Sequence, residues 1–418
     1  MRFISDLHLH SRFSRATSNK LNIPNLEQHA KLKGIGLLGT GDFMQPEWQK
    51  EIKQELQDDG SGIYRTKSGF PFILSNEISL MYKQNNKGRR IHVVLFAPNI
   101  DVVDQITAYF KKFGRVDYDG RPIFGKSAIE VTENLKQISN DIEIIPAHIW
   151  TPWFGALGSK SGFDSIQEAF GDQAKHIHSY ETGLSSDPQM NWRLSSLDKY
   201  TTLSFSDAHS FWPWRIGREA TLFDFNKLSY ANLIKAIRTR EGYAGTIEVN
   251  PNYGKYHFDG HRNCGVSFSP EESKKFGGVC PVCGKKLTIG VLYRVEELAD
   301  RPEGYTPKDV AECHTLIPLS ELIASINKTA VSSKKAWEIY NKLLAKFGSE
   351  FNVLLNASQY DLEKASDKNL AEFIIKNRTN DIYVKPGYDG VYGEPIFTHE
   401  DVPTVRRFKK PQKTLFDF

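Results

Sequence analysis

Histidines and carboxylates recur after the apolar segments of the first 210 residues. The set comprises His8, His10, Asp42, Glu77, His92, His148, Glu181, Asp207 and His209. Two histidines one residue apart point the same way from an extended segment, so His8 and His10 can bind one ion. Carboxylates such as Glu77 and Asp207 can bridge two ions, and neighbouring cations polarise a phosphoryl oxygen while activating a water. A single histidine is more often structural, but nine such residues at seven strand ends indicate a catalytic metal centre.

The elements that must position these residues alternate between short apolar runs and amphipathic stretches, the rhythm of β–α units. The pattern predicts strands at 2–4, 36–38, 72–74, 91–96, 142–145, 177–180 and 202–205, and helices at 25–33, 46–57, 102–113 and 127–138. In a β–α barrel all strand ends open on one face, where active sites are built. The nine residues are therefore expected to meet on that face.

A second metal site is indicated by the cysteines, all four of which lie between Cys264 and Cys313. His261-x-x-Cys264 and Cys280-x-x-Cys283 are separated by fifteen residues, the arrangement of a zinc ribbon whose first ligand is histidine. We expect a structural Zn²⁺ that stabilises a module too small for its own core. His257 and the Cys313-His314 pair are rival ligands.

Composition limits the class of protein. The chain has 418 residues, of which 39% are hydrophobic and 25% are charged, and a length of this kind suggests two to four domains. No run of 18 apolar residues predicts a membrane span, and the first residues lack the pattern of a signal peptide. Four cysteines are too few for a disulfide framework, so we expect a cytoplasmic protein. The net charge of +4 does not by itself indicate nucleic acid.

Several of the metal-binding segments resemble those of the PHP (polymerase and histidinol phosphatase) superfamily. The resemblance is carried by Asp6-x-His8-x-His10, Glu77, His148 with Pro152 nearby, and Ser206-Asp207-Ala208-His209. It implies a distorted (β/α)7 barrel, up to three metal ions and hydrolysis of phosphoesters. The sequence departs from many members at Thr40-Gly41-Asp42, where they have Thr-Asp-His.

The resemblance also implies how the ligands are shared among the ions. One ion would take His8, His10, Glu77 and Asp207, a second Glu77, His92 and His148, and a third Asp42 and His209. Glu181 would act as a ligand or would orient one. The catalytic ions are expected to be two or three Zn²⁺, Mn²⁺ or Mg²⁺ ions.

Other segments are similar to those of the endonuclease Q family within this superfamily. They are Trp150-Thr151-Pro152-Trp153, the segment 181–188 that begins Glu-Thr-Gly-Leu, Asp259-Gly260-His261-Arg262 and the segment 386–393. The similarity covers most of the chain in the order barrel, zinc ribbon, helical region. It implies a DNA-repair endonuclease that cleaves on the 5′ side of deaminated bases (hypoxanthine, uracil, xanthine) and of abasic sites. The altered base is expected to leave the helix stack.

This interpretation divides the chain into a barrel (1–250), a zinc module (251–312), a helical domain (313–400) and a basic tail (401–418). Residues 343–349 resemble a helix-hairpin-helix element, and 362–372 is expected to supply its second helix. Candidate contacts to DNA phosphates are Lys160, Arg193, Arg218, Lys346, Gly348 and Ser349. For any single cation, an ordinary solvated role is an equal alternative. Trp150, Trp153 and Phe154 could stack on a base or pack at the barrel rim.

In the tail, Gln412, Leu415 and Phe416 are similar to the peptide by which DNA-processing proteins bind a sliding clamp. The alternative is a tail that docks on its own domain. With damaged DNA as partner, we expect the protein to associate with the nucleoid.

Two other functions fit parts of the pattern. A PHP-family small-molecule phosphatase would explain the metal ligands but not the ribbon, the helical region or the tail. A non-catalytic, clamp-tethered DNA-binding protein would explain the last three but not the complete ligand set.

Overall fold

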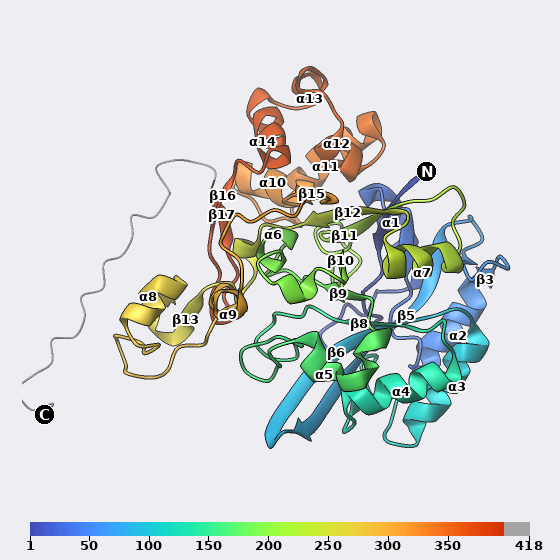
Figure 1. Ribbon diagram of the computed structural model, residues 1–418. Coiled ribbons are helices and arrows are strands. Elements are labelled where there is room, and N and C mark those ends of the chain that lie inside the picture. The colour runs from blue at the N-terminus through green and yellow to red at the C-terminus, as the bar shows by residue number, and fades with distance from the viewer. Residues whose placement is uncertain (397–418) are drawn as a thin grey trace, which may run out of the picture.

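The computed structural model describes residues 1–396 (Figure 1), which form an α/β fold around one mixed sheet. The strands follow the order β15-β12-β11-β1-β2-β5-β4-β3, with β7 beside β5 and with β6 between β5 and β8. Their bounds are β1 Arg2–Asp6, β2 Leu37–Gly39, β3 Gln57–Asp58, β4 Tyr64–Arg65, β5 Pro71–Gln84, β6 Lys87–Ala97, β7 Ile123–Phe124, β8 Glu143–Pro146, β11 Ala220–Asp224, β12 Tyr243–Glu248 and β15 Glu312–Thr315. The predicted mixed α/β class is confirmed.

Two further strands, β9 (Ser179–Glu181) and β10 (Thr201–Leu203), pair in parallel with each other. Single contacts join this pair to the main sheet. The Ile149 N–H donates to the carbonyl of Glu181 at 3.0 Å, and the His10 N–H donates to the carbonyl of Ala208 at 3.0 Å. All seven expected strands therefore form. Within residues 1–396 the hydrogen-bonded strand pairs do not form one unbroken ring. The distorted (β/α)7 barrel therefore stays a prediction.

The strand directions depart from the expected parallel rhythm. β1, β2 and β5 are parallel, but β6 runs antiparallel to both β5 and β8, and β11 runs antiparallel to β1 and β12. The cause for β6 is a tight turn at Asn85 and Asn86, both with positive φ, which folds β5 and β6 into one long hairpin. That hairpin carries two site residues in its middle.

The helices of the first half cover the sheet. They are α1 Ile23–Lys33, α2 Pro46–Glu55, α3 Ile100–Lys111, α4 Ala128–Ile138, α5 Ile166–Phe170, α6 Pro188–Asn191 and α7 Tyr230–Thr239. Asn22, Asn99 and Ser127 cap α1, α3 and α4 with side-chain oxygens that accept the N–H three residues later. The apolar faces of these helices, with Leu26 and Ile106 among their residues, are fully buried. The four predicted helices agree with α1–α4.

The cysteine module projects from the side of the main body (Figure 1). It contains β13 (Asp259–His261), β14 (Val266–Phe268) and α8 (Pro270–Lys275), followed by α9 (Val291–Leu298). Its own core is only Val266, Phe268, Cys280 and Leu287. A core of four side chains is too small to stabilise such a module without a further crosslink.

The helical region contains α10 Leu319–Ile326, α11 Lys334–Phe347, α12 Glu350–Leu355, α13 Gln359–Ala365 and α14 Lys368–Arg378. Gly348 ends α11 with φ +85° and Ser349 caps α12 directly afterwards. The second helix expected at 362–372 is therefore wrong, because α12 takes that place and 362–372 spans the end of α13 and the start of α14. β15 precedes these helices and pairs in parallel with β12 of the main sheet.

After α14, the chain forms a hairpin of β16 (Tyr383–Lys385) and β17 (Glu394–Ile396) whose loop, 386–393, reaches back to the approach to the cysteine module. The Gly390 N–H donates to the carbonyl of Lys255 at 2.8 Å, and Asp389 Oδ2 accepts the Arg262 N–H at 2.8 Å. We call residues 386–393 the return loop. It ties the end of the described chain to its middle.

The clamp-binding residues Gln412, Leu415 and Phe416 lie outside the described residues. The four-part division of the chain stays a prediction. Within residues 1–396, no helix has both the length and the apolar character needed to cross a membrane.

Candidate metal centre and active site

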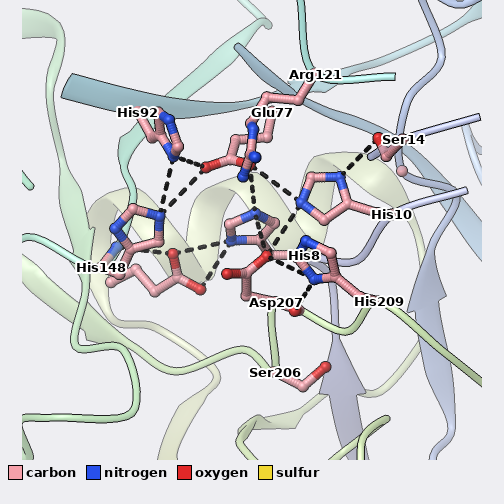
Figure 2. Close-up of polar contacts among 12 residues, drawn as sticks. His8, His10, Ser14, Glu77, His92, Arg121, His148, Ser206, Asp207 and His209 are labelled. Atoms are coloured by element: carbon pink, nitrogen blue, oxygen red, sulfur yellow. Dashed lines mark hydrogen bonds and ion pairs between the residues drawn. The ribbon is translucent and has the colours of Figure 1, made fainter. Parts of the chain in front are cut away.

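Four residues predicted to share one ion come together at the centre of the sheet. Ligand atoms of His8, His10, Glu77 and Asp207 all lie within 4.8 Å of one another. Glu77 Oε2 is 3.1 Å from His10 Nε2 and 3.5 Å from His8 Nε2, and Asp207 Oδ1 is 3.0 Å from His10 Nε2 (Figure 2). Imidazole nitrogens and carboxylate oxygens that converge in this way are the donor set of a divalent transition metal.

A second group contains Glu77, His92 and His148, again with ligand atoms within 4.8 Å. Glu77 Oε1 is 2.6 Å from His92 Nδ1 and 3.2 Å from His148 Nε2. The two oxygens of one buried carboxylate thus face different groups, Oε2 the first and Oε1 the second. Glu77 has the geometry of a bridge between two neighbouring ions.

Both histidines of the first group are held by a carboxylate on the far side of the ring. Glu181 approaches His8 Nδ1 with both oxygens at 3.0 Å, and Asp42 Oδ1 lies 3.1 Å from His10 Nδ1. His8 Nε2 is buried and has no hydrogen-bond partner. A carboxylate that fixes Nδ1 leaves Nε2 directed at the metal, an arrangement common in metalloproteins. Of its two predicted roles, Glu181 has the geometry of the orienting one.

Asp42 and His209, predicted to share a third ion, are not grouped in this way among residues 1–396. The Asp42 carboxylate accepts from the Ser14 hydroxyl at 2.8 Å and from the Ser11 N–H at 2.6 Å, besides its contact with His10. His209 lies beside the first group, with Nδ1 at 2.9 Å from the carbonyl of Asp207. The third ion stays a prediction.

The backbone is strained at three of these positions. Asp42, His148 and Asp207 have φ of 47°, 28° and 47°, in a region that side-chain-bearing residues rarely adopt. Such conformations persist where the surrounding structure fixes them, and they concentrate at functional sites. Each of the three directly follows a strand or its extension, as the sequence predicts.

Two residues are placed differently from the expectation. Glu77 and His92 lie inside β5 and β6 rather than at strand ends, because these strands are 14 and 11 residues long and pass beside the cluster. In their ladder Glu77 pairs with Val94 and Ser79 pairs with His92, so both side chains emerge close together from the hairpin. The short apolar runs in the sequence mark only part of each strand.

Charges in the cluster shift the pKa values strongly. Burial opposes protonation of His8, but Glu181 and Glu77 outweigh it and raise its pKa. Burial likewise disfavours the charged form of Glu77, yet His92, Arg121 and His8 hold its pKa well below the usual range. For His92 the effect of burial is larger than the opposing effect of Glu77, and its pKa falls to about 4. The Glu77 carboxylate is therefore ionised at neutral pH and available to bind cations.

The residue that sequence reasoning missed is Arg121, whose Nη1 lies 3.1 Å from Glu77 Oε2 (Figure 2). It belongs to the loop between α3 and β7 and follows none of the predicted strands. No spacing in the sequence could have identified it, because the loop's position depends on contacts with distant segments.

Five residues of the cluster line a cleft of about 650 Å³: His92, His148, Glu181, Asp207 and His209. Its walls come from three parts of the chain: Trp153 and Phe154 after β8, Lys255 and Tyr256 before the cysteine module, and Tyr392 of the return loop. Arg215 and Arg218 lie between this cleft and a side cavity of about 300 Å³. Of the aromatic residues singled out in the sequence, Trp153 and Phe154 line the cleft, whereas Trp150 is buried in the core.

The other residues predicted to contact DNA are scattered. Arg218 lines the cleft and donates to the carbonyl of Ser206 at 3.1 Å. Lys160 lines a separate polar cavity near the β5–β6 hairpin, and the carbonyl of Arg193 accepts the N–H groups of Asp300 and Arg301. Lys346 and Gly348 are exposed, but Lys346 Nζ donates to the carbonyl of Asp361 and Ser349 packs against Gly34. Their contacts with DNA stay predictions.

At the cysteine module, ligand atoms of His261, Cys264, Cys280 and Cys283 lie within 4.8 Å of one another. This is the predicted set of one histidine and three cysteines, suited to a tetrahedral ion. The rivals are elsewhere, since His257 Nδ1 contacts the carbonyl of Ser185 and Cys313 lies in β15. No disulfide forms within residues 1–396.

The whole arrangement matches solved structures of lesion-specific nucleases. The endonuclease PfuEndoQ from Pyrococcus furiosus superposes with a TM-score of 0.85, 32% sequence identity and coverage of 96% of each chain. The chain belongs to the endonuclease Q family. The predicted family and the predicted class of endonuclease are confirmed with it. A second endonuclease Q structure, bound to a 27-mer duplex substrate with an abasic lesion at the active site, gives a TM-score of 0.86 and 32% identity, over 96% of this chain and 98% of that one.

Two curated proteins are also similar. The uncharacterised protein MJ0043 of Methanocaldococcus jannaschii is 31% identical over 300 residues, which cover 71% of this chain but only 36% of that protein. The uncharacterised protein YqxK of Bacillus subtilis (strain 168) is 29% identical over 411 residues, 93% of this chain and 98% of YqxK. Residues 318–381 match the family described as the MJ0043 C-terminal domain. The match spans helices α10 to α14.

Proposed function

We propose that this member of the endonuclease Q family incises duplex DNA on the 5′ side of deaminated bases and abasic sites. One observation carries the proposal: a buried ligand cluster divided by Glu77 lines the cleft, in a chain similar along 96% of its length to a lesion-specific endonuclease. A small-molecule phosphatase would need the cluster but not a cleft walled by three separate parts of the chain.

The residues present fit catalytic divalent ions. His8 Nε2 is buried without a hydrogen-bond partner, and the neighbouring oxygens of Glu77 and Asp207 are kept ionised. Bound ions would supply polarisation of a phosphoryl oxygen and a water of lowered pKa. The protein's part is to hold the donors rigidly: Glu181 and Asp42 fix the two imidazole rings, and the packed core excludes other orientations. The proposed catalytic ions are two or three ions of Zn²⁺, Mn²⁺ or Mg²⁺.

The cleft has the charge and size for DNA. Lys255, Arg215 and Arg218 line it, and these cations would attract the phosphate backbone. A volume of about 650 Å³ falls in the range of sites that enclose a small organic ligand, so a nucleotide that has left the duplex could enter. Deaminated pairs cost less to open than normal pairs, which favours damaged nucleotides.

The remaining assignments complete the proposal. His261, Cys264, Cys280 and Cys283 would hold a structural Zn²⁺ that supports the small core of the module. Residues 1–250, 251–312, 313–400 and 401–418 are proposed as barrel, zinc module, helical domain and tail. A sliding clamp as a further partner, and association with the nucleoid in the cytoplasm, rest on the sequence alone.

Incision of end-labelled duplexes tests the function. Each duplex carries one uracil, hypoxanthine, abasic site or normal base, and the enzyme is stripped with chelator and then supplied with Mn²⁺, Mg²⁺ or Zn²⁺. We expect no activity without added metal and, with metal, a single product that ends on the 5′ side of each lesion. Asp207→Ala should abolish incision, whereas Asp104→Ala, at the surface of α3, should leave it unchanged.

Three outcomes contradict the proposal, each in a different way. Uniform nicking of undamaged duplex would show that the enzyme is not specific for lesions. Hydrolysis of a soluble monophosphate without incision of any duplex would favour the phosphatase. Wild-type incision by Asp207→Ala would mean that the cluster is not catalytic.

A further inference from the structure

Among residues 1–396, Arg121 is the arginine or lysine side chain that forms an ion pair with the ligand cluster. Its guanidinium donates to Glu77 Oε2 at 3.1 Å, and its side chain is 26% exposed, on the wall of the 650 Å³ cleft. A guanidinium has five N–H donors in a planar fork, and this contact uses one Nη atom. Arg121 therefore faces both the ligands and the space that a substrate would fill.

The loop that carries Arg121 is held firmly at both ends. Asp119 Oδ1 accepts the N–H groups of Arg121 at 3.1 Å and of Arg15 at 3.4 Å, and the carbonyl of Pro122 accepts the Ser79 N–H at 3.0 Å. Next to it, Gly120 lies so close to the cluster that a Cβ there would sit 2.0 Å from Asp42 Oδ2. These contacts hold Arg121 in place, unlike a freely moving surface arginine.

The contact with Glu77 alone does not account for Arg121. Glu77 directs Oε1 at one group of candidate ligands and Oε2 at the other, so both oxygens have cations to bind when ions are present. When both oxygens of a carboxylate bind cations, its negative charge is largely neutralised, and it attracts a further guanidinium only weakly. A phosphodiester entering the cleft brings a new negative charge, and arginine binds two phosphoryl oxygens at once.

We propose that Arg121 is a catalytic residue that binds the non-bridging oxygens of the scissile phosphate. The inference rests on the proposed function of this site. During hydrolysis a bond forms between the water oxygen and phosphorus, one phosphorus–oxygen ester bond breaks, the water gives up a proton and the leaving alkoxide gains one. Negative charge on the non-bridging oxygens grows in the transition state, and a fixed guanidinium stabilises it.

The test compares Arg121→Ala and Arg121→Lys with Arg115→Ala. Arg115 is a matched control, since it lies in the same loop, is exposed and, among residues 1–396, forms an ion pair with Asp117 alone. Incision of a uracil duplex is measured in single turnover, with DNA and metal saturating. We expect Arg121→Ala to be slower by roughly 10²- to 10³-fold, the usual effect of removing one preorganised donor. Arg121→Lys should be intermediate, because it keeps the charge but not the fork, and Arg115→Ala should equal the wild type.

A binding measurement separates catalysis from structure. In a duplex whose scissile phosphate is replaced by an uncharged methylphosphonate, Arg121 has no charge to bind. Metal-loaded wild type and metal-loaded Arg121→Ala should therefore bind it equally. Much weaker binding by Arg121→Ala, or a rate within threefold of wild type, would overturn the inference.

Failure of the proposed function would be recognised separately. If the wild type incises no duplex, the same variants are assayed on bis(p-nitrophenyl) phosphate. A rate loss confined to the Arg121 variants would retain the phosphate-binding role for a different substrate, whereas equal rates would remove it.

Discussion

At the scale of single residues, the cluster is organised by which nitrogen of each imidazole is occupied. Glu181 takes His8 Nδ1 and Asp42 takes His10 Nδ1, so that the Nε2 atoms of both rings face Glu77 and Asp207. Glu181 Oε2 also accepts the N–H of His148 at 2.9 Å. One buried carboxylate thus orients residues of both candidate metal groups.

Replacing Glu181 should weaken metal binding without removing a donor atom that faces the cluster. We expect Glu181→Ala to lower the affinity for Mn²⁺ or Zn²⁺ by about 10- to 100-fold, the usual effect of losing such a partner. Glu181→Gln keeps an acceptor for His8 Nδ1 and should lose less. Isothermal titration of the chelated protein measures both, with Glu130→Ala at the surface of α4 as control. Equal affinities in Glu181→Ala and the control would show that the rings keep their orientation unaided.

At the scale of elements, the sequence predicts what local pattern can encode. The apolar runs at 2–4 and 36–38 locate β1 and β2, and the caps and amphipathic spacing locate α1–α4. All nine predicted site residues except Glu77 and His92 follow strands as expected. The direction and length of the strands cannot be predicted from local pattern, because the β5–β6 register depends on pairing between strands. Nor can the place of Arg121, since Gly120 and Asp119 position its loop through contacts with residues about 80 to 105 positions earlier.

The segment that leads into the cysteine module carries a titratable group, His257. It is 5% exposed, its Nδ1 lies 3.2 Å from the carbonyl of Ser185, and burial lowers its pKa to about 4 from an ordinary 6.5. The folded state therefore binds fewer protons than the unfolded state between pH 6.5 and 4. Its contribution to stability is complete above pH 6.5 and is lost as the pH falls.

The expected size follows from that shift. Between pH 7.5 and pH 5, His257 should cost roughly 2 kcal/mol of unfolding free energy, because the unfolded imidazole is protonated first. Urea unfolding of wild type and His257→Gln at both pH values isolates this effect, since the other titrating groups are common to both. The variant should lose less stability than the wild type on acidification. A parallel decline of the two proteins would mean that His257 protonates without cost.

At the scale of the whole molecule, the helical region is anchored to the main body by one buried ion pair. Lys33 of α1 lies 2.6 Å from Glu350 of α12, and both side chains are almost completely buried. Lys33 also donates to the carbonyl of Pro213, and Glu350 accepts from the Tyr340 hydroxyl at 2.8 Å and the Leu319 N–H at 2.9 Å. Every polar atom of the pair has a partner, so the junction is specific as well as tight.

Removing one member should leave the other charged and buried. We expect Glu350→Gln or Lys33→Met to lower the unfolding free energy by about 3 to 5 kcal/mol, and the double variant Lys33→Met, Glu350→Gln to lower it by less than the sum. Lys31→Met is the matched control, because Lys31 lies on the same helix but pairs with Glu27 at the surface and should cost at most about 1 kcal/mol. Strictly additive losses would indicate that the two charges do not interact.

The return loop has a consequence for when the cleft comes into being. The candidate metal ligands of the cluster all precede residue 210, whereas Tyr392, which closes one wall, follows the last helix. The chain is synthesised from its N-terminus, so the metal ligands of a nascent chain can come together before Tyr392 has been added. In an endonuclease of this construction, the cleft is complete only after the chain has been translated as far as Tyr392.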